Sequence, residues 1–340
     1  MCERVHVDEE CLPAFRCRPP GVSRRPRGDG ADRGLGAGSQ EDHGRAVSWW
    51  PPSLEASHVA RLREGLQALG YVEGRNLELL VAFVGGDVAR ARAVARDYVE
   101  RGVDVIVAAA TPAATIAKEA TATRKIPIVM APVSDPVATG LVQSIARPGG
   151  NLTGMSMMGP DLTGKRLSLL RDIMPGLKSI AFVGWTRDQN SKTFLAGIRV
   201  ASSQIGVRLV EKMIDAVSEI DDALMAGLKA DGVDAVVIQP IFQGHQDRIV
   251  ATARGAKLPI VSDFPVFAEA GALMIYGMDD RSQLRRAGYF IDRIVKGTSP
   301  AELPIELPTE VAFVVNLKTA KEFGLTVPVS VLVGATDVIE

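Results

Sequence analysis

The sequence predicts an α/β fold made of two doubly wound lobes, each organised around a parallel sheet. Strand-like and helix-like segments alternate along the chain from residue 54 onward. Continuous apolar segments such as 103–110 are typical of strands that are buried on both faces of a parallel sheet. Blocks of sequence also recur at an offset of about 130 residues, which indicates that one structural unit occurs twice.

The first unit is predicted element by element from apolar spacing and from turn residues. Apolar residues at helical spacing over 54–69 predict a helix that ends at Gly70, and the helix over 89–101 ends at Gly102. A third helix is predicted over 112–122. The strands between these helices are predicted at 76–84, 103–110 and 126–133.

Three blocks of the first unit return in the second half of the chain. "RGVDVIVAAA" (101–110) returns as "DGVDAVVIQP" (231–240), and "IPIVMAPVSD" (126–135) returns as "LPIVSDFPVF" (258–267). Gly70 matches Gly206 at an offset of 136 residues. Two α/β halves can resemble each other by class alone, but the shared Gly-Val-Asp opening favours a true repeat of two βαβ lobes.

The repeat leaves a gap at the start of the first lobe. The second lobe opens with a clear strand at 177–184, whereas the matching segment "HGRAVS" (43–48) does not have a strand-like pattern. We therefore expect the first lobe to lack its opening strand. Residues 1–51 are rich in Arg, Gly and Pro and contain no apolar run typical of a secretory signal, so we expect a disordered or non-native tail.

Composition and motifs exclude several function classes. The net charge of −1 gives no basic field for nucleic acid, and the Gly- and Pro-rich tail argues against a DNA-binding domain. All three cysteines lie in the first 17 residues, so the folded body needs no disulfide or thiolate metal site, and we expect no cofactor. Nucleotide-binding and metalloprotease motifs are absent from the sequence. Binding without catalysis is therefore the leading hypothesis, and His58 is expected to face solvent.

Ligands of open α/β sheets bind outside the carboxyl ends of the strands, so two facing lobes predict a site in the cleft between them. In the first lobe, the turns at this edge are Thr111-Pro112-Ala113 and Ser134-Asp135. Each turn reads as a helix cap, with Thr111 as the cap residue of the first. The same groups could also bind a ligand, with helix N–H groups for a carboxylate and Asp135 for an amine.

In the second lobe, the matching turns contribute aromatic and hydrogen-bonding side chains. The candidate ligand contacts there are Trp185, Asn190, Gln239, Phe242, Asp263 and Tyr276. Together with Phe267, the aromatic residues favour an aromatic or apolar ligand, although Trp185 could equally cap the core. Arg187 and Asp188 are expected to form a solvated turn, and no residue is assigned to catalysis or to a metal.

Six stretches of the sequence resemble the solute-binding proteins of bacterial ABC transporters, a family that includes tryptophan- and tyrosine-binding members. The resemblance covers roughly 52–340. Its markers are "LREGLQALGYVEGRNLEL", "ATPAA", "IPIV…SDPVATGLVQSIARPGGNLTG", "KRLSLLRDIMPGLKSIAFV", "GALMIYG" and "LPIELPTEVAFVVNLKTAKEFGLTVP". The last of these stretches is the most distinctive.

The resemblance implies a type I periplasmic-binding fold, in which two α/β lobes joined by three crossovers close on a ligand. The crossovers are expected at 149–160, 272–280 and 303–315, with a helix over 281–297 returning to the first lobe. Lobe 1 would comprise 52–153 plus 279–305, and lobe 2 would comprise 156–275 plus 310–340.

The same resemblance implies a monomeric, periplasmic or otherwise extracytoplasmic protein that is not an enzyme. Such a protein would deliver an amino acid-like, aromatic or carboxylate solute to an ABC transporter permease. The alternatives are a ligand-sensing domain of a receptor or regulator and, less favoured, a doubly wound enzyme. One wall of the family's cleft comes from the opening strand, which we expect to be missing.

Overall fold

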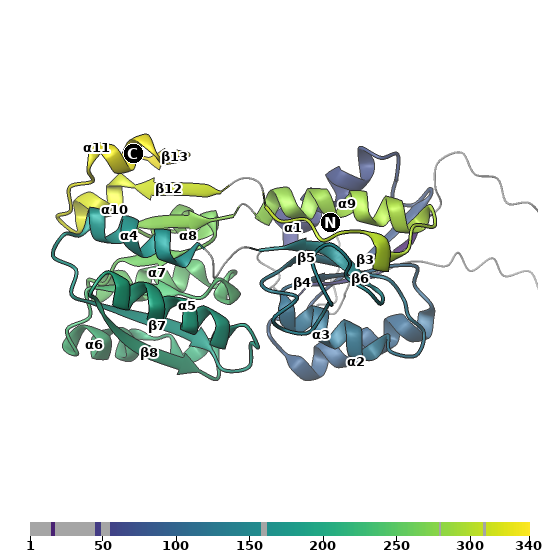
Figure 1. Cartoon of the computed structure of the whole chain (residues 1–340), viewed down its shortest axis with the longest axis horizontal. Coiled ribbons are helices and arrows are strands. Elements are labelled where there is room, and N and C mark those ends of the chain that lie inside the picture. The colour runs from purple at the N-terminus through teal and green to yellow at the C-terminus, as the bar shows by residue number, and fades with distance from the viewer. Residues whose placement is uncertain (1–14, 18–44, 49–54, 158–161, 279, 309–310) are drawn as a thin grey trace, which may run out of the picture.

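The computed structural model describes residues 15–17, 45–48, 55–157, 162–278, 280–308 and 311–340. These residues form two lobes that lie side by side along the long axis of the molecule (Figure 1). Each lobe contains one sheet with helices on both of its faces. The predicted α/β class with two doubly wound lobes is confirmed.

The sheet of the first lobe has the strand order β1-β3-β2-β4-β5-β6. Its strands are β1 Phe15–Cys17, β2 Arg45–Ser48, β3 Leu77–Phe83, β4 Ile106–Ala109, β5 Ile128–Val133 and β6 Leu152–Ser156. All neighbouring strands pair in parallel except β1, which runs antiparallel to β3. Every residue of β4 and β5 is buried, as expected for strands covered on both faces.

The sheet of the second lobe has the order β13-β12-β11-β10-β9-β7-β8. Its strands are β7 Ser179–Trp185, β8 Arg208–Ile214, β9 Ala235–Ile238, β10 Ile260–Ser262, β11 Met274–Gly277, β12 Ala312–Asn316 and β13 Asp337–Ile339. The order β8-β7-β9-β10-β11 repeats the order β3-β2-β4-β5-β6 of the first sheet. The internal repeat inferred from the sequence is therefore also a repeat of topology.

The expectation that the first lobe lacks its opening strand is wrong. Strand β2, at 45–48, pairs in parallel with β3 on one side and with β4 on the other. It occupies the same place as β7 in the second lobe, at the offset of 136 residues. A four-residue strand that starts with Arg and ends with Ser carries little local signal, and its two neighbours supply the pairing. The expectation of disorder over 1–51 is also wrong for 15–17, which form β1 and pair with β3. The other residues of that stretch, 1–14, 18–44 and 49–51, lie outside the described residues.

Helices cover both faces of the first sheet. Helices α1 (Glu55–Gln67) and α9 (Asp280–Val295) lie on one face, and α2 (Val88–Arg101) and α3 (Thr111–Ala120) lie on the other. Helix α9 packs against α1 and β5, so the predicted return of this segment to the first lobe is confirmed (Figure 1). Gly102 ends α2 in the left-handed conformation, with φ 65°, as the sequence predicted.

The second sheet is covered in the same way. Helices on one face are α4 (Thr163–Ile173), α5 (Ser191–Gln204), α10 (Leu317–Glu322) and α11 (Val329–Val333). Helices on the other face are α6 (Asp222–Ala230), α7 (Gln246–Gly255) and α8 (Pro265–Glu269). The described residues also form the short 3-10 helices η2 (Val217–Glu219), η3 (Pro240–Phe242) and η4 (Pro300–Glu302).

The chain passes between the lobes three times, as expected. It leaves β6 for α4, leaves β11 for α9, and runs from η4 to β12. The third segment lies along the edge of β6, because the N–H of Glu306 donates to the carbonyl of Gly154 at 3.0 Å. The Ser156 N–H in turn donates to the Glu306 carbonyl at 3.0 Å. The first and third passages therefore lie next to each other.

Two glycines allow α1 and α9 to approach closely. A Cβ on Gly65 would lie 2.0 Å from the carbonyl oxygen of Arg285, and one on Gly288 would lie 2.8 Å from the carbonyl carbon of Gly65. Both obstacles are backbone atoms, so the helices themselves would have to separate. The pair of glycines thus sets the distance between α1 and α9.

We expect Gly65→Ala to lower the free energy of unfolding by about 1–3 kcal/mol, the usual cost of overpacking a buried contact. Gly227→Ala is the matched control, because Gly227 lies in α6 and a Cβ added there would meet no atom within 4 Å. The control should raise the stability by up to about 1 kcal/mol, since alanine favours helix more than glycine. Denaturant unfolding followed by circular dichroism checks both, and equal effects would contradict the close packing.

Candidate functional site

The two lobes meet at the edges where their parallel strands end. Asn190, which precedes α5 in the second lobe, donates a hydrogen bond from Nδ2 to Oγ1 of Thr111 in the first lobe. Gln243 of the second lobe lies with its Nε2 3.2 Å from Nε2 of His58 on α1. One continuous cluster of buried apolar side chains also includes residues of both lobes. The two lobes are therefore in direct contact along the predicted cleft.

A small cavity lies between the lobes at the carboxyl ends of the central strands. Its volume is about 20 Å³, enough for a single water molecule. Both lobes contribute to its lining, which consists of Ala110, Thr111, Pro132, Ser134, Met157, Asp188, Gln239, Pro240, Ile241 and Phe264. Three predicted site residues, Thr111, Ser134 and Gln239, thus come together in one place.

A larger pocket of about 320 Å³ opens beside this cavity, and Ile241 lines both. The first lobe contributes the turn after β3, and the second lobe contributes the turns after β7, β8 and β9. The lining residues are Gly85, Gly86, Asp87, Trp185, Arg187, Asp215, Ala216, Val217, Ile241, Phe242, Gln243 and His245. The predicted aromatic residues Trp185 and Phe242 therefore lie in the same pocket.

The side chain of Gln239 holds the second-lobe wall of the cavity. Its Oε1 accepts hydrogen bonds from the Trp185 N–H at 2.9 Å and from the Ser191 hydroxyl at 2.8 Å. Its Nε2 donates to Oδ2 of Asp188 at 2.6 Å. One buried amide therefore fixes the end of β7, the start of α5 and the turn between them.

Asp188 is a buried carboxylate on the cavity wall, with 5% of its surface exposed. Its Oδ1 also accepts the N–H of Asn190 at 3.0 Å. Burial raises the pKa of Asp188 to about 6, although the hydrogen bonds from Asn190 and Gln239 oppose this shift. The expectation that Asp188 belongs to a solvated turn is wrong, because the Gln239 amide draws the turn against β9.

The sequence predicted that Thr111 caps α3, and this prediction is wrong. Ala110 occupies the cap position, and Thr111 is the first residue of the helix. Its freed hydroxyl oxygen accepts from the N–H of Ser134 at 3.3 Å as well as from Asn190. Ala110 has φ 70°, a conformation that side-chain-bearing residues rarely adopt and that often marks binding sites.

Pro112 and Ala113 are buried in the first turn of α3 and line neither pocket. Asp135 is half-buried and also lies outside both linings. Its carboxylate accepts the N–H groups of Val137 and Ala138 at 3.1 and 2.9 Å. The predicted helix after Ser134-Asp135 is wrong, because residues 136–140 form successive turns.

Asp263 and Tyr276 are engaged within the second lobe. Oδ2 of Asp263 forms an ion pair with Nη2 of Arg166 at 2.7 Å, and both side chains are buried. Burial raises the pKa of Asp263 to about 6, and the charge of Arg166 opposes this shift. Arg166 also donates from Nε to the carbonyl of Tyr276 at 2.8 Å, while the Tyr276 ring packs edge-on against Phe313. Neither residue lines the two inter-lobe pockets.

Sequence reasoning missed several residues of the site. His58 is 4% exposed and lies against Gln243, so the expectation that it faces solvent is wrong. The turn Gly85-Gly86-Asp87 directly follows a predicted strand and could have been found by the rule that identified Thr111. Asp188 gave no such signal, because its burial depends on Gln239, fifty-one residues away in the sequence.

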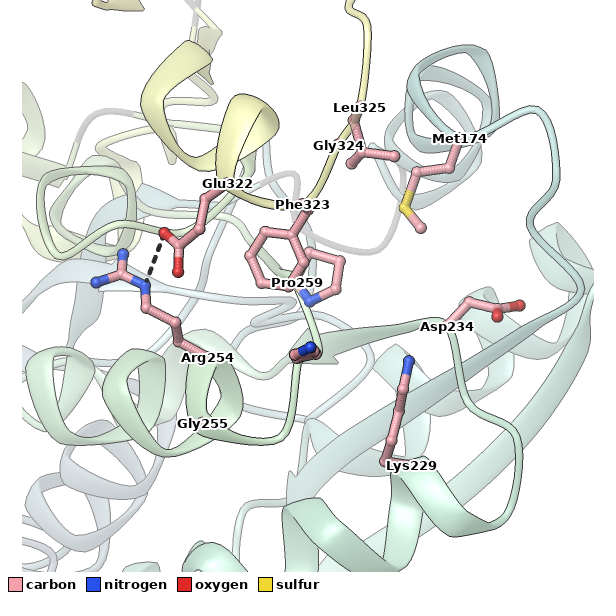
Figure 2. A pocket seen from close by; sticks show the side chains of 11 residues that line it. Met174, Lys229, Asp234, Arg254, Gly255, Pro259, Glu322, Phe323, Gly324 and Leu325 are labelled. Carbon is pink, nitrogen blue, oxygen red and sulfur yellow. Dashed lines mark ion pairs between the residues drawn. The ribbon is translucent and has the colours of Figure 1, made fainter.

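A third pocket, of about 580 Å³, lies in the second lobe (Figure 2). Its lining includes the amino ends of strands whose carboxyl ends face the cleft, so it lies at the opposite edge of the sheet. Asp234 and Pro259, at the starts of β9 and β10, line it together with Arg254, which pairs with Glu322 at 3.2 Å. None of the predicted site residues lies there. The described residues contain no cluster of His, Cys, Asp or Glu that could hold a metal ion. Within the same ranges, no helix has the length and apolar character needed to cross a membrane.

Comparisons with known proteins agree with this architecture. A tyrosine-binding protein of Clostridioides difficile (strain R20291) is 28% identical over 275 residues, which cover 81% of this chain and 78% of the relative. An ABC domain from Streptococcus pneumoniae, solved in complex with L-Trp, is 27% identical with a TM-score of 0.77. That match covers 86% of this chain and 99% of the other.

A conserved domain protein from Vibrio cholerae is 28% identical, with a TM-score of 0.77, and the match covers 86% of this chain and 98% of the other. The model of the ABC transporter substrate binding protein family matches residues 51–339, nearly all of the described chain. The matched family and the tyrosine-binding relative are binding proteins rather than enzymes. The two repeated lobes, the three passages between them and this match together show that the chain belongs to the ABC transporter substrate-binding protein family.

Proposed function

We propose that this protein binds an amino acid-like, aromatic or carboxylate solute between its lobes and delivers it to an ABC transporter permease. The observation that carries the proposal is the pair of neighbouring pockets to which both lobes contribute side chains. A ligand in that position touches both lobes and therefore favours their closed arrangement. The family match and the amino acids named for two relatives support this class of solute.

In this proposal, lobe 1 comprises 52–153 plus 279–305, to which β2 is now added, and lobe 2 comprises 156–275 plus 310–340. The three passages between the lobes act as the hinge of an opening and closing motion. Delivery to a permease places the working protein outside the cytoplasm, as is usual for the family, and it acts as a monomer. No cofactor takes part.

The residues predicted from sequence take different roles in this site. We assign solute contact to Thr111, Ser134, Trp185, Asn190, Gln239 and Phe242, all of which line a pocket or bond across the cleft. The others support the site from behind: Pro112, Ala113, Asp135, Asp263 and Tyr276. Pro112 and Ala113 form the first turn of α3, and Asp135 holds the turn after β5. Asp263 and Tyr276 hold the buried side chain of Arg166.

Thermal unfolding with a panel of solutes tests the proposed function. We expect L-tryptophan, L-tyrosine or another apolar L-amino acid to raise the melting temperature. A ligand at 100 times its Kd stabilises the bound state by about 2.7 kcal/mol. Glucose and ribose should leave the melting temperature unchanged and serve as controls. A full panel of amino acids and aromatic carboxylates without any shift would contradict the proposal.

Thr111→Val tests the hydrogen bond across the cleft. Valine keeps the shape of threonine but removes the oxygen that accepts from Asn190 and Ser134. Because a buried donor without a partner costs about 1–3 kcal/mol, the Kd for the solute should rise about 5- to 150-fold. Thr111→Ser, which keeps the hydroxyl, should bind nearly like the wild type. Calorimetric titration of the three proteins measures the effect, and indistinguishable affinities would refute the role of this bond.

The raised pKa of Asp188 predicts a pH effect on stability without ligand. The folded state holds this proton more tightly than the unfolded chain, whose aspartates have a pKa near 3.9. The carboxyl therefore imposes no penalty below about pH 4, and it lowers the free energy of unfolding as the pH rises to about 6. The total loss is on the order of 2–3 kcal/mol. Asp188→Asn should lose less stability over this range in denaturant unfolding, whereas parallel pH curves would speak against the assignment.

A further inference from the structure

The second lobe buries two aspartates with very different partners. Asp263, 4% exposed, forms its ion pair with Arg166 at 2.7 Å. Within the part of the chain that the structure describes, Asp188, 5% exposed, receives its side-chain hydrogen bonds from neutral groups alone: the Asn190 N–H at 3.0 Å, Asn190 Nδ2 at 3.5 Å and Gln239 Nε2 at 2.6 Å. No Lys, Arg or His among the described residues forms an ion pair with Asp188 or influences its ionisation. The aspartate without a counter-charge is the one that lines the inter-lobe cavity.

Asn190 presents a second acceptor next to Asp188. Its side chain is 1% exposed, and its Nδ2 is used by the bond to Thr111 and lies 3.5 Å from Oδ1 of Asp188. Its Oδ1 is buried and has no hydrogen-bond partner among the described residues. A buried acceptor without a donor costs free energy, as does a buried carboxylate without a counter-charge. Among the described residues, therefore, no donor reaches Asn190 Oδ1 and no positive charge pairs with Asp188.

An alkylammonium group supplies both missing features, since it carries three N–H donors and one positive charge. A carboxylate in the same place would supply neither and would be repelled by Asp188. We propose that Asp188 and Asn190 form an ammonium subsite, which restricts the solute to compounds with a cationic amine. This inference rests on the proposed function and names the chemical class that the same cleft selects.

The neighbouring larger pocket could hold the part of the solute that carries no amine. Ile241 lines both the small cavity and the pocket of about 320 Å³, so the two are neighbours, and Trp185 and Phe242 offer apolar surface in the larger one. An amine held at Asp188 would therefore direct an aromatic or branched aliphatic group toward these side chains. The raised pKa of Asp188 agrees with the subsite, because burial without a counter-charge makes the carboxylate less stable, and a bound cation would lower this pKa again.

Matched compounds separate the amine from the rest of the solute. Calorimetric titrations of the wild type would use L-tryptophan, tryptamine, which lacks the carboxylate, and indole-3-propionate, which lacks the amine. L-leucine, isoamylamine and 4-methylpentanoate form an aliphatic set of the same design. We expect the amino acid and the amine of at least one set to bind, and the acid of that set to bind at least about 100-fold more weakly, as for a buried charged partner left unpaired.

Asp188→Asn should raise the Kd of the amine-bearing compounds about 30-fold or more, because it removes a buried charged partner. The Kd of the plain acid should stay the same or fall, since the repulsive charge is gone. Asp172→Asn, on the exposed face of α4, removes an equal charge away from the cleft and should leave every affinity unchanged. Asp188→Asn should unfold at the same or a higher temperature at pH 7, so a loss of binding cannot arise from misfolding.

The outcomes distinguish the two proposals. A wild type that binds an acid as tightly as its amino acid would overturn the ammonium subsite and leave the solute-binding function intact. An equal loss of all three compounds of a set in Asp188→Asn would also overturn it. A wild type that binds none of the six compounds, and nothing in the wider panel, would contradict the proposed function itself.

Discussion

Parallel pairing of the strands is the constraint on which the rest of the structure depends. Because β2 to β6 run in one direction, and β7 to β11 do the same, each lobe gathers the ends of its strands at a single edge. The turns at that edge need no regular pairing of their own and can carry polar side chains. Two such edges face each other, and the two neighbouring pockets lie between them.

The lobes are held internally by stronger interactions than those that join them. Inside the second lobe, the Gln239 amide and the buried pair of Arg166 and Asp263 fix the turns that face the cleft. Between the lobes, the polar contacts described are few and involve neutral groups, such as Asn190 with Thr111.

Features that leave a pattern in neighbouring residues could be predicted from the sequence, whereas features that depend on distant segments could not. Strands β4 and β7 were predicted correctly because continuous apolar runs reveal burial on both faces without knowledge of the neighbours. Strand β2 was missed because four residues carry little pattern and its pairing partners lie far along the chain. Thr111 was placed in the right wall but given the wrong role, since the cap position was taken by Ala110 in an unusual conformation.

By itself, the sequence determined the α/β class, the duplication of the lobes and the resemblance to solute-binding proteins, and it predicted the sheet edge at which the pockets between the lobes lie. These features follow from periodicity and from repeats, which are properties of neighbouring residues. Only the tertiary structure decided which polar residues are buried and with which partners. Asp188 and Asp263 look alike in the sequence, yet one faces the cleft without a cation and the other meets Arg166. Burial and charge pairing depend on segments that are distant in the sequence, so no local pattern can report them.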